Sequence, residues 1–192
     1  ELARGDVDAA GDHLAEAREW GALRDLVVDS AEEAWQTMSY DPLRSWIGRL
    51  PAEHRDPTLL LTSALMDLLA GHHEMAATTL TALEGTDLTP GERMVALNIS
   101  VALVSSTGSF DRIRRDAAEA EELASIVPVE DIPAVAGVPG ATLLPWSRVH
   151  AAQADMFLGE LTAEDGPSDP DHLAALQPLL AVNALGGHAV RA

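Results

Sequence analysis

The chain has 192 residues, of which 47% are apolar and 4% aromatic, and its formal net charge is −19. All twelve basic residues are arginine, against 31 acidic ones. A surface this acidic repels polyanions, which excludes direct binding to nucleic acid or to anionic membranes. The absence of cysteine excludes disulfides and thiolate metal sites, and no run of 18 apolar residues exists to span a membrane. The abundance of Ala and Leu favours helices over strands.

The N-terminal quarter predicts three helices. Asp6 is a candidate cap for a helix over 7–20, and Gly21 is expected to end it. Apolar residues at helical spacing predict a second helix over 22–38. Asp41-Pro42 has the order of a helix cap followed by proline, which predicts a third helix to about residue 50.

The stretch from Asp56 to Gly85 predicts a pair of antiparallel helices. Asp56 is a good N-cap, Pro57 suits the first helical position, and Gly71 supplies a left-handed end. Residues 59–70 are apolar almost all round, as expected of a helix buried between neighbours. The second helix is expected over 74–83. One pair cannot bury both sides of its first helix, so further pairs must pack against it.

The second half predicts four more helices and two loops. Thr89-Pro90-Gly91-Glu92 is a capping box that opens a helix to about 105. Further helices are expected over 110–126, 144–158 and 171–185. The proline- and glycine-rich residues 128–140 and the acidic residues 160–170 are expected to be loops, giving irregular segments near 127–141 and 160–170.

A repeat becomes visible when glycines are aligned. Gly5, Gly71 and Gly108 are each followed five residues later by an apolar residue and then by the same helical stripe. Turns fall about 34 residues apart, which is the tetratricopeptide period. The sequence therefore predicts one all-α domain over 1–192, a right-handed superhelix of antiparallel helix hairpins with about nine helices. A compact bundle of the same helices remains the alternative.

Residues 35–85 resemble the helical sensor region of MalT-like, LuxR-type ATP-dependent transcription regulators. The resemblance is carried by Leu43-Arg44-Ser45-Trp46-Ile47-Gly48-Arg49-Leu50-Pro51, and then by Glu53, Arg55 and Pro57. In that family a helix of this type is followed by a charged linker, a proline and a leucine-rich helix that ends in Ala-Gly.

The resemblance implies a sensor segment that binds an effector or a partner protein and lies between an ATPase region and a DNA-binding region of the same chain. This sequence holds neither region, because it has no Gly-Lys-Ser/Thr loop and no basic helix. We therefore expect a fragment of a longer cytoplasmic protein that binds neither DNA nor ATP itself. A free-standing adaptor that binds peptides or proteins is the alternative, and an enzyme is not expected.

Five side chains are candidates for contact with an effector or peptide: Trp35, Tyr40, Trp46, Trp146 and His150. Each also has a structural interpretation, because tryptophans at helical spacing pack hairpins together. His72-His73 does not predict a metal site, since neighbouring residues on a helix point about 100° apart. No nucleophile elbow is present, so the sequence predicts no catalytic residue, metal or cofactor.

Overall fold

The computed structural model describes residues 4–104 and 110–158, with side chains from 7–104 and 112–149. This part of the chain is all-helical, as predicted, and contains no strand. Its helices are α1 (Arg4–Ala17), α2 (Trp20–Thr37), α3 (Asp41–Arg49), α4 (Pro57–Leu69), α5 (His73–Leu83), α6 (Pro90–Val104), α7 (Phe110–Ile126) and α8 (Gly140–Leu158). The described residues thus hold eight helices rather than about nine, and the one expected over 171–185 lies outside them.

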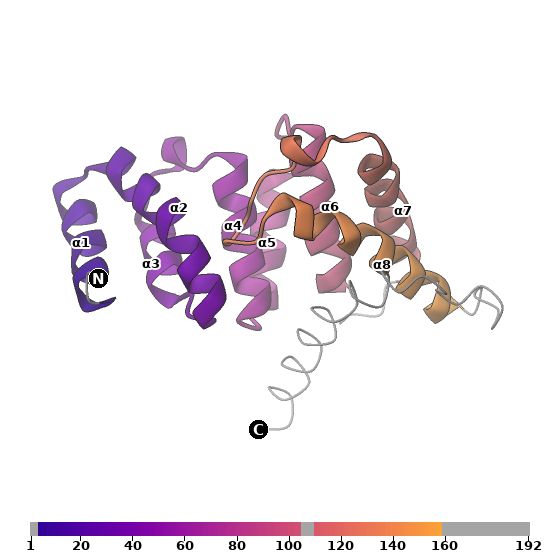
Figure 1. The fold of residues 1–192 in the computed structure, drawn as a ribbon, viewed down its shortest axis with the longest axis horizontal. Coiled ribbons are helices and arrows are strands. Elements are labelled where there is room, and N and C mark those ends of the chain that lie inside the picture. The colour runs from indigo at the N-terminus through magenta and orange to yellow at the C-terminus, as the bar shows by residue number, and fades with distance from the viewer. Residues whose placement is uncertain (1–3, 105–109, 159–192) are drawn as a thin grey trace, which may run out of the picture.

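The helices form a row in which each packs chiefly on its neighbours in sequence (Figure 1). Tight pairs are α4 with α5, α6 with α7, and α7 with α8. Contacts between α4 and α6 and between α6 and α8 join one pair to the next. The main apolar cluster extends along the row from Ala15 to Val149. A smaller cluster of four residues lies between α6 and α7.

Two predicted helix starts are confirmed in atomic detail. Asp56 caps α4, with its Oδ1 accepting a hydrogen bond from Leu59 N at 2.9 Å. The capping box before α6 is complete: Thr89 N donates to Glu92 Oε2 at 2.9 Å and Glu92 N donates to Thr89 Oγ1 at 3.2 Å. Local sequence chemistry therefore fixes where these helices begin.

Left-handed residues end three of the helices, and only one of them is a glycine. Arg18, Met38 and Gly71 have φ values of 58°, 52° and 80°. In each case the next backbone N–H returns to a carbonyl five residues earlier, as in a Schellman motif. The prediction that Gly21 ends the first helix was therefore wrong. The break is at Arg18, and Gly21 lies inside α2.

Two further boundaries differ from prediction. Gly5 lies inside α1 rather than in a turn, so Asp6 does not cap that helix. Gly108 lies outside the described residues, which leaves Gly71 as the described member of the aligned glycines that forms a turn. The last described helix begins at Gly140, four residues before the predicted start, and includes Pro145. The superhelix itself stays a prediction.

The segment between α7 and α8 folds back along the row, which periodicity alone does not foresee. We call residues 132–139 the strap. In Figure 1 the strap is the orange segment that runs back from the α7 side to α4. Its tip is a four-residue turn closed by reciprocal backbone hydrogen bonds between Val135 and Val138. Val135, Ala136 and Val138 are at most 1% exposed. The strap is therefore part of the core.

The strap tip is held against α2 and α4. Ala136 and Gly137 have φ values of 52° and 77°, the left-handed pair of a type I′ turn. Ala136 N donates to Thr62 Oγ1 of α4 at 3.2 Å in a buried position. A Cβ on Gly137 would overlap the carbonyl oxygen of Ala31 in α2. Only glycine fits there, for both conformational and steric reasons.

Gly137→Ala should therefore destabilise the fold strongly. The matched control is Gly71→Ala, because Gly71 also has positive φ but has open space where a Cβ would lie. The control should lose about 1–2 kcal/mol, the usual cost of a left-handed non-glycine residue. Gly137→Ala adds a backbone clash and should lose about 3 kcal/mol or more. Urea unfolding measures both; equal losses would contradict the packing of the strap on α2.

Candidate functional site

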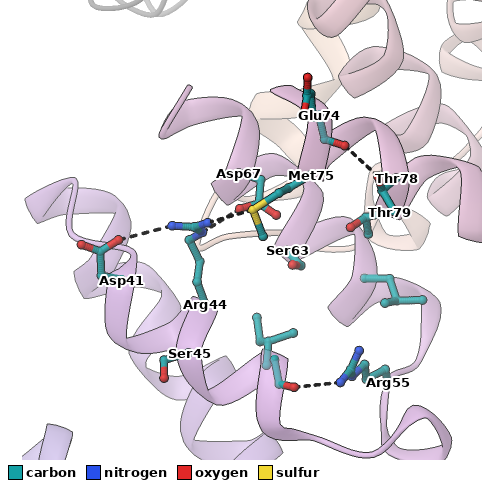
Figure 2. Close-up of a pocket in the computed structure, with 13 residues that line it drawn as sticks. Asp41, Arg44, Ser45, Arg55, Ser63, Asp67, Glu74, Met75, Thr78 and Thr79 are labelled. Atoms are coloured by element: carbon teal, nitrogen blue, oxygen red, sulfur yellow. Dashed lines mark hydrogen bonds and ion pairs between the residues drawn. The ribbon is translucent and has the colours of Figure 1, made fainter. Parts of the chain in front are cut away.

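A hollow lies between α3 and α5, with α4 as its floor. We call it the outer groove; its volume is about 600 Å³. It opens on a side of α4 different from the strap, because Leu60, Ser63 and Asp67 face the groove whereas Thr58, Leu59 and Thr62 face the strap side. Polar lining residues of the groove are drawn in Figure 2 and comprise Asp41, Arg44, Ser45, Arg55, Ser63, Asp67, Glu74, Thr78 and Thr79.

One end of the groove is organised by a buried ion pair. Asp67 of α4 has a side chain only 4% exposed, and Arg44 of α3 one that is 17% exposed. Arg44 Nε lies 2.6 Å from Asp67 Oδ1. The other guanidinium nitrogens make longer contacts, 3.4 Å from Nη1 to Asp41 Oδ1 and 3.7 Å from Nη2 to Met75 Sδ. Asp67 thus fixes the direction of the Arg44 side chain while the outer nitrogens remain weakly bound.

The other end of the groove is organised by Arg55, which follows the short 3₁₀ turn Ala52–His54. Its Nε donates to the carbonyl of Leu50 at 2.7 Å and its Nη2 to the carbonyl of Gly48 at 3.0 Å. Both carbonyls belong to the C-terminal end of α3, where the helix dipole favours a cation. Figure 2 shows Arg44 and Arg55 on opposite sides of the hollow.

Hydroxyl groups of Ser45, Ser63, Thr78 and Thr79 also line the groove. Thr78 Oγ1 donates to the backbone carbonyl of Glu74 at 2.8 Å. The hydroxyls of Ser45, Ser63 and Thr79 have no hydrogen-bond partner within the described part of the chain. The groove therefore offers several hydrogen-bonding groups to a ligand, beside apolar surface from Ile47, Leu60 and Met75.

A second groove of about 410 Å³ occupies the corresponding place between α5, α6 and α7. Its floor residues Arg93, Ala96 and Ser100 each follow a floor residue of the outer groove by 33 residues (Leu60, Ser63 and Asp67). Here the charges are already paired. Arg93 Nε lies 2.9 Å from Glu119 Oε1, and this hydrogen bond raises the pKa of Arg93.

The polar floor of the second groove is also internally satisfied. Ser100 Oγ donates to Asp116 Oδ2 at 2.9 Å, and Arg112 Nε lies 3.3 Å from the same carboxylate oxygen. The second groove thus resembles the outer groove in position but leaves less polar capacity for a ligand. The outer groove is the stronger candidate site.

A third hollow of about 530 Å³ lies beside the strap. It is lined mainly by apolar residues of α2, α4 and the strap, with the Arg24–Asp56 ion pair among its lining groups. Val28, on its wall, is 59% exposed. Its polar side chains are already engaged in the ion pair, in the α4 cap or in other hydrogen bonds.

The aromatic candidates lie away from these three hollows. Trp46 is 2% exposed and packs against Gly11, where a Cβ would overlap the indole ring. It borders only a small hollow of about 40 Å³. Tyr40 is 5% exposed and directs its hydroxyl to Met38 Sδ at 3.4 Å. Trp35 is partly buried against the main apolar cluster.

The remaining two candidates are on α8. Trp146 is 5% exposed and belongs to the main cluster. The backbone of His150 lies in α8, and its side chain is outside the described residues. The structure therefore does not bring the five candidates together at one place. It brings together Arg44, Asp67 and Arg55 instead. The only advance signal for them was that all three lie in residues 35–85, and that Arg44 and Arg55 are among the residues that carry the resemblance to LuxR-type regulators.

Within residues 4–104 and 110–158, no group of three or more His, Asp or Glu side chains is placed to hold a metal ion. Nor does any helix in these ranges combine the length and hydropathy needed to cross a bilayer.

Asp67→Asn should destabilise the fold through the loss of a charge-assisted, buried hydrogen bond. We expect a loss of about 1.5–3 kcal/mol in the free energy of unfolding. Asp41→Asn is the matched control, because Asp41 contacts the same arginine but its side chain is 94% exposed. The control should change stability by less than about 0.5 kcal/mol. Comparable losses measured by urea unfolding would argue against an organising role for Asp67.

Burial of Tyr40 raises its pKa from 10.0 to about 12. Because the folded-state pKa lies above the unfolded one, the stabilisation is complete below pH 10 and is lost as pH rises from 10 through 12. Tyr40 is the chain's single tyrosine, so absorbance at alkaline pH reports it alone. We expect ionisation near pH 12 in the folded protein. A midpoint near 10 with the fold intact would show that Tyr40 is exposed.

Comparison with known proteins adds no relative: no family model, curated protein or solved structure matches this chain.

Proposed function

We propose that this chain is the sensor and interaction segment of a MalT-like, LuxR-type regulator, and that its effector binds in the outer groove. In this proposal the helices continue as a right-handed superhelix of tetratricopeptide-like hairpins. The segment itself binds neither ATP nor DNA, and it works in the cytoplasm between regions that do.

One observation carries the proposal. The residues on which the resemblance to this family rests also build the candidate site: Arg44, Ser45, Ile47 and Gly48 of α3, and Arg55 beyond it, line the outer groove. Three polar residues of this stretch, Arg44, Ser45 and Arg55, converge on a hollow whose size suits a small ligand. The 33-residue offset of the second groove supports a repeat architecture.

The mechanism is a population shift. The outer groove separates α3 from α5, which belong to successive helix pairs along the row. An effector that contacts both helices would favour the spacing of those pairs that fits it best. Its influence on an adjoining ATPase region equals its difference in affinity between the two arrangements. An effector with equal affinity for both arrangements would bind without changing the ATPase region.

The test of this role is the open reading frame on both sides of the segment. We expect a Gly-Lys-Ser/Thr loop upstream and a basic helix-turn-helix downstream. If both are present, purified full-length protein should change its ATPase rate when the outer groove is altered by Asp67→Asn. A short frame with neither region would reject the regulator and favour the peptide-binding adaptor.

A further inference from the structure

We infer that the ligand of the outer groove is a small molecule carrying a phosphate or carboxylate group, with Arg55 as the anchor for that group. The inference rests on the proposed function to the extent that it names the ligand class of the same groove.

Arg55 holds a full positive charge that no carboxylate neutralises within the described part of the chain. A guanidinium group has five N–H donors. Two nitrogens of Arg55, Nε and Nη2, donate to the carbonyls of Leu50 and Gly48. These carbonyls fix the plane of the group but carry only partial charges. Nη1 and the net charge remain available to an anion.

Most other arginines with described side chains differ from Arg55 in this respect. Six of them lie within 4.0 Å of a carboxylate: Arg24 with Asp56, Arg44 with Asp67, Arg49 with Asp12, Arg93 with Glu119, and Arg112 and Arg115 with Asp116. Arg18 and Arg148 have no such partner within the described residues, but neither lines the outer groove. In a chain of net charge −19, a carboxylate partner is easily found. Arg55 is held rigidly, has no carboxylate partner and lines a hollow. It is therefore suited to bind an anion from solution.

The opposite side of the groove can hold the rest of such a ligand. Arg44 Nη1 and Nη2 make only long contacts, at 3.4 Å and 3.7 Å, which a ligand oxygen can replace. The unpartnered hydroxyls of Ser45, Ser63 and Thr79 also line the groove. A ligand with an acidic group at one end and hydroxyl or carbonyl oxygens along its length would satisfy them.

The acidic residues of the groove do not oppose this assignment. Asp67 is paired with Arg44, so the negative charge of its carboxylate is largely balanced and repels a bound anion only weakly. Asp41 and Glu74 are at the rim, where they are exposed to water and salt screens their charges. The volume of about 600 Å³ is that of a site for a small molecule rather than for a folded partner.

The experiment is a titration of the whole chain followed by ¹H–¹⁵N spectra of the arginine Nε–H groups. Arg44 Nε and Arg55 Nε both donate hydrogen bonds, which slows exchange of their protons and makes them observable. The probes are glycerol 2-phosphate, L-malate and, as the uncharged control, glycerol. We expect saturable shifts of both signals with at least one anion and none with glycerol. Whichever anion binds more tightly identifies the acidic group.

Arg55→Gln should weaken binding of the anion about tenfold or more, the effect of losing a charged hydrogen bond to a ligand. Arg49→Gln is the matched control, since Arg49 lies on α3 but pairs with Asp12 outside the groove. It should bind like the unaltered protein. The combined change Ser63→Ala and Thr79→Val keeps Arg55 in place and should weaken binding about twofold to fivefold.

Absence of saturable shifts with either anion would overturn the inference, as would unchanged affinity in Arg55→Gln. If Arg55→Gln fails to fold by circular dichroism, unchanged affinity in the double hydroxyl variant overturns it instead. These outcomes are separate from the regulator proposal, because the flanking reading frame answers that question independently of any ligand.

Discussion

Helix α4 is buried on nearly every side, and the rest of the described structure is arranged to cover it. Its buried residues include polar Thr62 and Asp67 as well as leucines. An unpaired polar group in such a place would cost about 1–3 kcal/mol, so each needs a partner brought from elsewhere in the chain. The strap supplies a backbone N–H to Thr62, and α3 supplies Arg44 to Asp67. These two contacts link opposite sides of α4 to distant segments.

The two sides of α4 marked by these contacts differ: the strap side is filled by packing, whereas the outer side is open to a ligand. On the strap side, valines and an alanine complete the apolar core, and the turn is closed by its own backbone. On the outer side, hydroxyls and guanidinium groups surround a hollow. Trp46 and Tyr40 are buried in the apolar core, although the sequence makes both of them candidates for contact with a ligand. Large side chains at helical spacing fill cores more often than they line sites.

Much of the fold was predictable from local chemistry. The caps at Asp56 and Thr89 and the turn at Gly71 follow from side-chain hydrogen bonding and from the freedom of glycine. The helix ends at Arg18 and Met38 were not predictable in this way, because ordinary, exposed residues take the left-handed conformation there, with local backbone hydrogen bonds closing each end. The strap was read only as a loop. Its contact with α2 depends on backbone atoms of Ala31 and Gly137, and no side-chain pattern records such a contact.

The candidate site was less predictable than the fold. Arg44 and Arg55 were visible in the sequence, but their separation from Asp67 along the chain hid the arrangement that makes them a site.

The strap also bears on the order in which the chain can assemble. Helical-repeat arrays generally depend on contacts between neighbours, so that each pair can form as it leaves the ribosome. Here Ala136 bonds Thr62 across 74 residues of sequence. The inner side of α2 and α4 therefore stays open to water until the segment beyond α7 has been synthesised. Helices α1 to α4 therefore cannot complete their packing without the strap. A fragment that ends before residue 132 would leave the inner side of α2 and α4 exposed to water.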